Sequence, residues 1–204
     1  MKLRQLAIRL SNLKAHTGNN LDLEQYSITG NLAARWISDI LSFGDINYSS
    51  TVTDLGAGNG ILGIGCQLVG AKKTIFFESD SNACKVIKDN LINESLIKSA
   101  KIINQHISKD NLPIIDSDVI ITNPPWGRQL EKADRPFLDA ILASGKTAHI
   151  LHSSNATHIT KLFENAGWSV EKYGEADFAL PANYIHHNRQ RSKTIAGFWR
   201  VSKD

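Results

Sequence analysis

The chain is poor in cysteine and has no long uninterrupted run of apolar residues. Each of these features argues against particular classes of protein. Only two cysteines, Cys66 and Cys84, occur in 204 residues, and they form neither a disulfide framework nor a paired metal-binding spacing. A secreted disulfide scaffold and a metal site are therefore not indicated, and a reducing cytoplasm is the expected setting. No apolar stretch approaches the ~20 residues of a membrane helix, and no secretory leader pattern opens the chain. We expect no membrane-bound part.

The net charge is only +3, so the chain lacks the strongly basic balance that would by itself indicate a nucleic-acid partner. Its charges are nevertheless uneven, because bases dominate both ends and acids dominate the middle. The bases of the two ends are Lys2, Arg4, Arg9, Lys14, Arg189, Arg191, Lys193, Arg200 and Lys203. If the ends meet in the fold, these residues make one basic face suited to phosphates. The alternative is that they are ordinary solvated surface charges.

With 42% hydrophobic residues, the chain is long enough for one ordinary core, so a single domain over residues 1–204 is expected. Apolar residues recur at helical spacing in residues 3–13 and again from Leu32 to Leu41, which predicts an N-terminal helical extension within residues 1–48. From Thr51 onward, short apolar runs alternate with helical segments. This pattern is typical of βαβ units in a mostly parallel sheet.

Seven strands and four further helices are expected after Thr51. The strands lie near residues 51–55, 73–78, 101–107, 117–122, 147–152, 168–174 and 193–201, and the helices near 61–70, 81–94, 134–144 and 155–166. Asp134 is a candidate N-cap. Because no helix separates the last two strands, we expect them to form an antiparallel hairpin at the sheet edge. The predicted fold class is α/β, with a seven-stranded, mostly parallel sheet and an antiparallel edge hairpin.

A glycine-rich segment, Asp-Leu-Gly-Ala-Gly-Asn-Gly at residues 54–60, follows the first expected strand and opens a helix, which is the context of a nucleotide-binding turn. Its glycine spacing departs from G-x-G-x-x-G and so disfavours a nicotinamide cofactor. The carboxylate of Asp54 suits a ligand that carries an amino group and a sulfonium, which points to S-adenosylmethionine. Glu78 ends the second strand, where a carboxylate can accept hydrogen bonds from both ribose hydroxyls. A plain strand-to-helix turn is the alternative.

Nine residues are predicted to bind the cofactor on these grounds. They are Asp54, Gly56, Gly58, Asn59, Gly60, Ile61 and Glu78, with His106 and Ile107 near the adenine at the end of the third strand. The last two carry no strong motif, since a lone histidine in such a place is more often structural.

The segment Asn-Pro-Pro-Trp at residues 123–126 follows the fourth expected strand and should face the same crevice as the Gly-rich turn. An adenine amine is a poor nucleophile because its lone pair is delocalised into the ring. If the Asn123 side-chain oxygen and the Pro124 carbonyl accept its two hydrogens, that lone pair is freed. Pro124 and Pro125 fix φ and hold the carbonyls outward, and Trp126 can stack on a base flipped from its strand. The alternative is a proline-rich turn beside a core tryptophan.

Together these motifs resemble the N6-adenine methyltransferases of the Asn-Pro-Pro-aromatic class, and more narrowly the small archaeal and eukaryotic family that methylates an adenine in small-subunit ribosomal RNA. The resemblance spans nearly the whole chain and includes Leu-Glu-Gln-Tyr at 23–26 and Leu-Pro-Ala-Asn-Tyr at 180–184. It implies a Rossmann-like class I methyltransferase fold, S-adenosylmethionine as cofactor, and Gln25 against that cofactor. It also implies a basic stretch that approaches RNA, with Arg189, Arg191 and Lys193 as the candidate contacts.

The chain departs from the family pattern at three places: Ser27-Ile28 follows the tyrosine instead of Pro-Thr, His106 replaces an Asp that commonly contacts adenine, and Trp126 replaces the commoner Phe. The resemblance further implies a small zinc-binding activator subunit as a partner. The third strand, residues 101–107, is expected at an open sheet edge, where a partner strand could pair with its backbone.

Two other functions are compatible with the same motifs. Glutamine methyltransferases of release factors share the Asn-Pro-Pro-aromatic loop, because an amide nitrogen poses the same lone-pair problem. They carry a larger N-terminal helical domain, whereas only about fifty residues precede Asp54 here. A cofactor-binding, RNA-associated protein without catalysis is the other alternative, and the intact Asn123 gives it no support.

Overall fold

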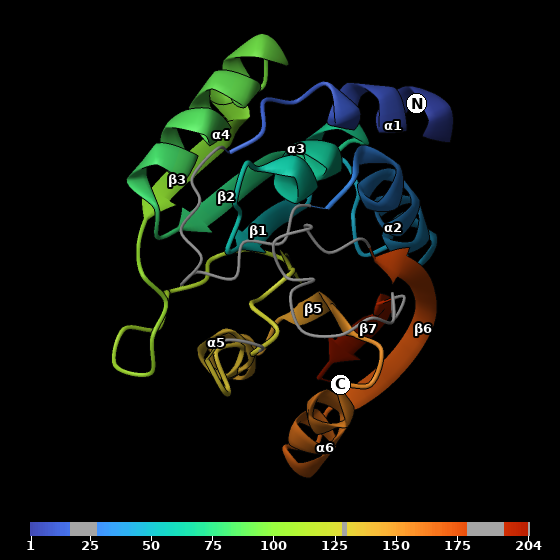
Figure 1. The fold of residues 1–204 in the computed structure, drawn as a ribbon, viewed down its shortest axis with the longest axis vertical. Helices are drawn as coiled ribbons and strands as arrows, with labels where there is room; N and C mark the ends of the chain where they lie inside the picture. The colour runs from blue at the N-terminus through green and yellow to red at the C-terminus, as the bar shows by residue number, and fades with distance from the viewer. Residues whose placement is uncertain (17–27, 128–129, 179–193, 204) are drawn as a thin grey trace, which may run out of the picture.

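The structure, a computed structural model, describes residues 1–16, 28–127, 130–178 and 194–203 (Figure 1). In chain order its elements are α1 (Leu3–Ser11), α2 (Gly30–Ser42), β1 (Thr51–Leu55), α3 (Ile61–Leu68), β2 (Lys73–Glu78), α4 (Ser81–Asn93), the 3₁₀ helix η2 (Ile97–Ser99), β3 (Ala100–Asn104), β4 (Val119–Thr122), α5 (Arg135–Ser144), β5 (Thr147–Ser153), α6 (Thr157–Asn165), β6 (Ser169–Phe178) and β7 (Thr194–Ser202). Four predicted contact residues lie outside the described residues: Gln25, Arg189, Arg191 and Lys193.

All seven strands belong to one sheet, in the order β3-β2-β1-β4-β5-β7-β6. β1 pairs in parallel with β2 and β4, while β7 runs antiparallel to both β5 and β6. The predicted α/β fold, with a mostly parallel sheet and an antiparallel edge hairpin, is confirmed. The outermost strand, β6, extends to Phe178, beyond its predicted end at residue 174. Of the four added residues, Glu175 and Asp177 are charged and exposed, as an edge strand with a solvated face allows, so the hydrophobic signal there was weak.

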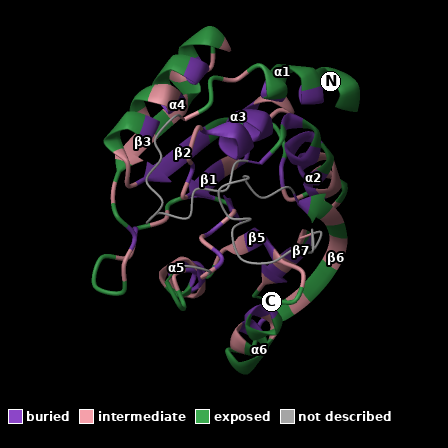
Figure 2. Ribbon diagram, in the orientation of Figure 1, coloured by how far each residue is buried: buried purple, intermediate pink, exposed green. Residues whose placement is uncertain are grey.

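Helices cover both faces of the sheet, which therefore lies between two hydrophobic cores (Figure 1). The helices α1 to α4 pack on one face, where Ile37 and Ile64 are fully buried. The other face is covered by α5 and α6, which bury Leu138 and Phe163. Figure 2 shows the central strands as buried and the outer sides of the helices as exposed. Among the described residues, no helix is long and apolar enough to cross a membrane.

The N-terminal helices pack closely against the sheet through α3. A Cβ atom at Gly65 of α3 would lie 2.2 Å from Cδ1 of Ile37 and 3.3 Å from Cδ1 of Leu10. Only glycine therefore allows α3 to approach α1 and α2 this closely, because a packed interior cannot absorb such an overlap. The tight contact joins the predicted N-terminal extension to the helix that follows the Gly-rich turn.

A chain of hydrogen bonds also ties the extension to the antiparallel strands. Trp36 Nε1–H donates to the Tyr173 hydroxyl at 2.7 Å, and that hydroxyl lies 3.0 Å from Nδ1 of His149. Nε2 of His149 lies 2.9 Å from Oδ2 of Asp45, which also accepts from Arg200 at 2.7 Å. A neutral His149 with its proton on Nε2 satisfies each of these contacts. Burial lowers the pKa of His149 and favours that neutral form, although Asp45 opposes the shift.

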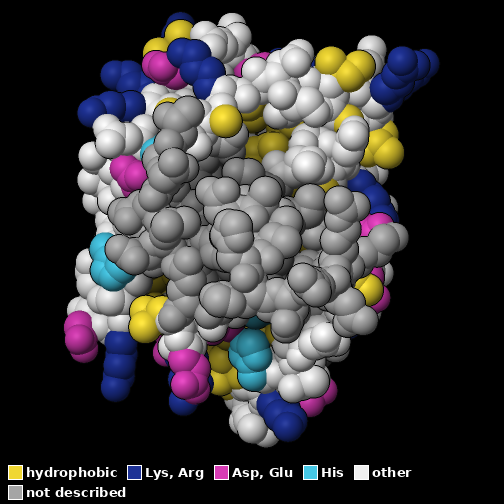
Figure 3. All heavy atoms as spheres, viewed as in Figure 1, with side chains coloured by type: hydrophobic (Ala, Val, Ile, Leu, Met, Phe, Trp, Pro, Cys, Tyr) yellow, Lys and Arg dark blue, Asp and Glu magenta, His cyan; other side chains and the backbone are white. Residues whose placement is uncertain are grey.

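Among the described residues, the basic side chains of the two ends do not lie together. The N- and C-terminal ends lie far apart in Figure 1. Three of the bases are instead held in ion pairs within the chain, namely Arg9–Glu94, Lys14–Asp89 and Arg200–Asp45. Figure 3 shows the described Lys and Arg side chains spread around the rim of one face, interspersed with acidic ones. The expectation of a single basic face is therefore wrong for the described residues.

The third strand is shorter than predicted, since β3 ends at Asn104 and not at residue 107. The Asn104 side chain turns back and donates to the carbonyls of Glu78 and Ser79, at 2.8 and 2.9 Å. This side-chain bonding competes with continued strand pairing. The chain then enters a loop in which Asn111 donates to the His106 carbonyl. His106 and Ile107 accordingly follow the strand and do not belong to it.

Candidate functional site

Three segments assigned to the site leave the sheet side by side at one edge. Leu55 of β1 is in register with the penultimate residue of β2 and with Thr122 of β4. Gly56, Glu78 and Asn123 therefore lie at the carboxyl ends of three adjacent strands, where open α/β sheets bind ligands. A hydrogen bond of 2.8 Å from Thr122 Oγ1 to the Leu55 carbonyl joins β4 to β1 at this level. The Gly-rich turn and the Asn-Pro-Pro-Trp segment thus meet at one edge, as the sequence predicts.

The Gly-rich turn is held in shape by hydrogen bonds to β2. The N–H groups of Gly56 and Ala57 both donate to the Phe77 carbonyl, at 2.9 and 3.0 Å, and the N–H of Gly58 donates to Glu78 Oε2 at 2.7 Å. Gly58 has a φ of +57°, and no atom of the described residues lies within 4 Å of the position that a Cβ would take there. Within the described part of the chain, the turn therefore presents bare backbone, as close approach of a ligand requires.

Asp54 lies beneath the turn and is only 1% exposed. Its Oδ2 accepts a hydrogen bond from the Gly63 N–H at 2.8 Å, whereas Oδ1 has no hydrogen-bond partner among the described residues. Burial raises the pKa of Asp54 to about 7; the Gly63 hydrogen bond opposes this shift and the Glu78 carboxylate adds to it. A cation bound nearby would offset the burial of this carboxylate, so the arrangement favours a positively charged ligand.

Glu78 lies between the turn and the start of α4, and it is 6% exposed. Its Oε2 accepts from the Gly58 N–H, while Oε1 accepts from the Asp80 N–H at 2.9 Å and from Ser79 Oγ at 3.3 Å. A carboxylate oxygen accepts about two hydrogen bonds, so binding of two ribose hydroxyls requires the Ser79 hydroxyl to rotate away. The sequence predicts Glu78 as the ribose acceptor but does not predict the hydrogen bonds that this carboxylate already accepts.

The remaining predicted cofactor residues occupy varied positions. The Asn59 side chain donates to the Lys14 carbonyl at 3.1 Å and accepts from the Ile61 N–H at 3.3 Å, so it joins the turn to the segment after α1. Ile61 is the buried first residue of α3. His106 is exposed in the loop after β3, and Ile107 is buried in the core that α5 and α6 cover.

The Asn-Pro-Pro-Trp segment is held partly by contacts within itself. Trp126 Nε1–H donates to Asn123 Oδ1 at 3.1 Å. The Trp126 ring stacks on His152, with ring centroids 5.6 Å apart and planes at 22°, and it also contacts Phe178 at 4.7 Å. Trp126 is only 7% exposed. A base can therefore stack on the indole only after neighbouring residues move aside.

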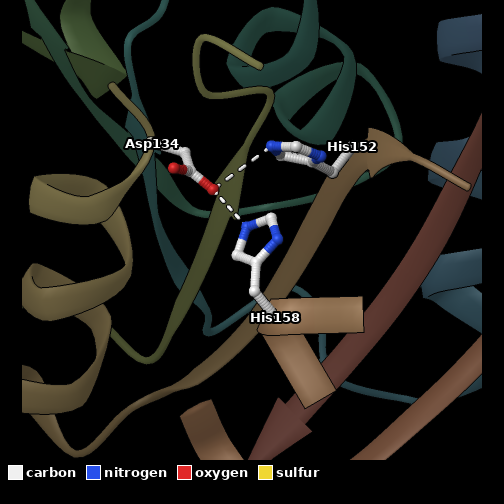
Figure 4. Close-up of side chains that lie close together, drawn as sticks. All are labelled: Asp134, His152 and His158. Atoms are coloured by element: carbon white, nitrogen blue, oxygen red, sulfur yellow. Dashed lines mark hydrogen bonds and ion pairs between the residues drawn. The ribbon is translucent and has the colours of Figure 1, made fainter. Parts of the chain in front are cut away.

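Three residues that sequence reasoning did not assign to the site lie close together, namely Asp134, His152 and His158 (Figure 4), and His152 stacks on Trp126. Asp134 immediately precedes α5, while His152 comes from β5 and His158 from α6, so no local motif connects them. Asp134 carried a signal, but for helix capping, and His152 lies in β5 together with a second buried histidine, His149. Two histidines in a strand near the sheet centre are a feature that could have drawn attention to the cluster.

Comparisons with known proteins agree on one family. The family model of the methyltransferase small domain matches residues 40–167. An uncharacterized protein of Methanocaldococcus jannaschii is 32% identical, over 100% of this chain and 95% of its own length. The rRNA N(6)-adenosine-methyltransferase Mettl5 of Drosophila melanogaster is 29% identical, over 98% of this chain and 96% of its own length.

Among solved structures, the chain is similar to a crystal structure of a Pyrococcus horikoshii protein that was provisionally assigned as an RNA methyltransferase. The two share 31% identity and a TM-score of 0.86, with 100% of this chain and 98% of that chain covered. The fold, the two motifs at one sheet edge and these relatives lead to the same conclusion. The protein is an enzyme of the methyltransferase class, and the chain belongs to the methyltransferase small domain family.

Proposed function

We propose that this methyltransferase transfers a methyl group from S-adenosylmethionine to the exocyclic amine of an adenine in RNA, with small-subunit ribosomal RNA as the substrate class. The observation that carries the proposal is the position of Asn123, which follows β4 directly beside the Gly-rich turn of β1. The activity named for the Drosophila relative supports the same substrate class. Arg189, Arg191 and Lys193, outside the described residues, are the proposed contacts to RNA phosphates.

The residues around the Gly-rich turn fit such a cofactor. Among the described residues, the backbone at Gly58 is open and leaves space for it, and Oδ1 of Asp54 has no partner and favours a ligand with positive charge. The Glu78 carboxylate is the proposed acceptor for the ribose hydroxyls. The other proposed contacts are Gln25, Gly56, Asn59, Gly60, Ile61, His106 and Ile107. When bound, S-adenosylmethionine supplies a methyl group made electrophilic by its sulfonium.

The chain's own contribution to the chemistry is to free the lone pair of the amine. An amide oxygen accepts up to two hydrogen bonds, so Asn123 Oδ1 can hold the Trp126 N–H and an amine hydrogen together. The Pro124 carbonyl is the proposed acceptor for the second amine hydrogen, and Pro125 keeps the loop rigid. When the amine nitrogen gains the methyl group, the cofactor sulfur would keep the electrons of its broken bond as a neutral thioether, and the nitrogen would release one proton to solvent water. No strong general base is required, because the methylated nitrogen is acidic at that point.

One assay distinguishes this proposal from its two rivals. Labelled S-adenosylmethionine is incubated with the protein and either small ribosomal subunits or a peptide release factor. We expect label in the RNA alone. Label in the release factor alone would establish glutamine methylation, and cofactor binding with no label in either acceptor would establish a non-catalytic role.

Replacing Glu78 with alanine is expected to weaken cofactor binding at least tenfold, because a hydrogen bond to a charged group contributes about 1.5 to 3 kcal/mol. The variant also removes the acceptor of the Gly58 N–H, which holds the turn. Isothermal titration calorimetry measures the change, with Glu164→Ala, at an exposed position of α6, as control. An unchanged affinity would remove Glu78 from the cofactor site.

We also propose that a small zinc-binding partner pairs with β3. The strand is terminal in the sheet order, and its Ile102 and Ile103 are only partly buried. A terminal strand offers backbone groups to a partner strand. We expect the protein purified alone to aggregate or to show reduced activity on ribosomal subunits, as measured by light scattering and methyl transfer. A stable monomer with full activity would contradict this partner.

A further inference from the structure

The clearest polar cluster outside the predicted site consists of Asp134, His152 and His158 (Figure 4), and it contacts Trp126 through His152. Nε2 of His158 lies 2.5 Å from Asp134 Oδ2, and Nε2 of His152 lies 3.3 Å from the same oxygen. Asp134 and His152 are almost fully buried, at 5% and 2% exposure, whereas about half of the His158 side chain is exposed. Buried polar groups of this kind need a structural or functional reason.

One hydrogen bond fixes the tautomer of His152. Its Nδ1 accepts from the Ser153 N–H at 2.8 Å, so the proton of the neutral ring is on Nε2, which lies at ion-pair distance from Asp134, 3.3 Å from its Oδ2, without the alignment of a hydrogen bond. A metal ion would need the lone pair of that nitrogen. The arrangement therefore favours a histidine oriented by a carboxylate over a metal site.

Asp134 departs from the usual behaviour of a residue in its position. It is the N-cap of α5, but its side chain makes no capping hydrogen bond. An aspartate N-cap normally stabilises a helix through that bond. Here burial raises the pKa of Asp134, but hydrogen bonds from His152 and His158 outweigh this effect and lower it overall. Because Asp134 occupies the N-cap position without making the capping bond, its side chain is a candidate for another role.

The contact between His152 and Trp126 indicates this role. Its ring lies nearly parallel to the Trp126 indole, and the Trp126 N–H is bonded to the Asn123 amide oxygen. One continuous path therefore runs from the Asp134 carboxylate through His152 and Trp126 to Asn123. Each contact limits the freedom of the next side chain, and the path ends at the atom proposed to receive the substrate amine.

We infer that His152 is a positioning residue for methyl transfer: its imidazole, oriented by Asp134, supports Trp126 and thereby holds the Asn123 amide ready for the adenine amine. The inference rests on the proposed function, because the amine is the substrate only there. It adds that the base is received by a Trp126–Asn123 pair set in place before RNA binds. Preorganisation of this kind is what lets a hydrogen-bonding group act on a transition state.

The test compares His152→Ala, which removes the ring, with Asp134→Asn, which keeps the side-chain size but removes the charge. Lys161→Ala, at an exposed position of the same helix as His158, is the control. We expect His152→Ala to lower kcat on RNA about 10-fold, the upper range for one aromatic pair, with the cofactor Kd unchanged. Asp134→Asn should show a smaller loss in kcat, and Lys161→Ala none.

A spectroscopic measurement keeps the inference testable apart from activity. The emission of Trp126 is obtained by subtracting the spectrum of the matching Trp126→Phe protein, and circular dichroism confirms that each variant is folded. We expect this emission to shift to longer wavelength in His152→Ala as the ring becomes exposed. If the parent protein methylates RNA and folded His152→Ala keeps the parental kcat, the inference is overturned whatever the emission. If the parent protein transfers no methyl group to RNA, the proposed function fails. In that case an unshifted Trp126 emission in His152→Ala overturns the positioning contact as well.

Discussion

Asn123→Ala is expected to lose most methyl transfer to RNA while binding the cofactor normally. The amide oxygen at the end of β4 is the acceptor proposed to draw a hydrogen from the adenine amine, and alanine has no atom in its place. Removing one preorganised hydrogen-bonding group of this kind lowers kcat by about 100-fold to 1,000-fold. Cofactor affinity should be preserved, because the cofactor is assigned to Asp54 and Glu78 on neighbouring strands. Single-turnover kinetics and calorimetry measure the two quantities separately.

Trp126→Phe is the matched control for this experiment. It keeps an aromatic ring against His152 but removes the N–H that donates to Asn123 Oδ1. We therefore expect it to retain substantial activity, well above that of Asn123→Ala. An Asn123→Ala enzyme with near-normal turnover on RNA would mean that the amine is activated elsewhere.

Asp45→Ala is expected to destabilise the fold by about 3 kcal/mol, because it leaves the His149 and Arg200 donors without their acceptor. The estimate is at the low end for a broken buried pair, since the Asp45 side chain is 15% exposed. Burial raises the pKa of Asp45, but hydrogen bonds from His149 and Arg200 outweigh it, so that the pKa lies well below its usual range. This contribution is present above the ordinary pKa of an aspartate and is lost only in strong acid.

Urea unfolding at pH 7.5 is the appropriate measurement. The lowered pKa of His149 means that its stabilising contribution is complete above the unfolded value of about 6.5 and falls as the pH drops below it. Asp110→Ala, at an exposed loop position, is the control and should be neutral. A loss below about 1 kcal/mol for Asp45→Ala, the range of exposed ion pairs, would show that the network does not tie the extension to the sheet.

The parts of this site that sequence reasoning could locate are those defined by neighbours in the chain. A strand followed by closely spaced glycines, or by Asn-Pro-Pro-Trp, has a backbone geometry that can be predicted locally. Glycine permits positive φ, and proline fixes φ. The order of strands then brings both motifs to one edge. The fold class followed in the same way from periodicity, and so did most strand positions.

The parts that were missed depend on contacts between distant segments. His152 is a strand residue by every local measure, and its role becomes visible only when Trp126 and Asp134 lie next to it. The Asp45–His149 contact likewise joins residues more than 100 positions apart. The burial of Asp54 could not be predicted either. Nothing in the Gly-rich segment shows that this carboxylate lies under the turn, or that one of its oxygens has no partner among the described residues. Long-range packing decides such details, and a single sequence does not encode them in any local pattern.

The central claim is that the enzyme methylates the amine of adenine in RNA through Asn123, and nucleoside analysis of the labelled product tests it most directly. Small ribosomal subunits are incubated with labelled S-adenosylmethionine and either the parent protein or Asn123→Ala, the RNA is digested to nucleosides, and the label is assigned by chromatography and mass spectrometry. We expect the label to appear as N6-methyladenosine with the parent protein and to be nearly absent with Asn123→Ala. Label in any other nucleoside, or equal labelling by the two proteins, would contradict it.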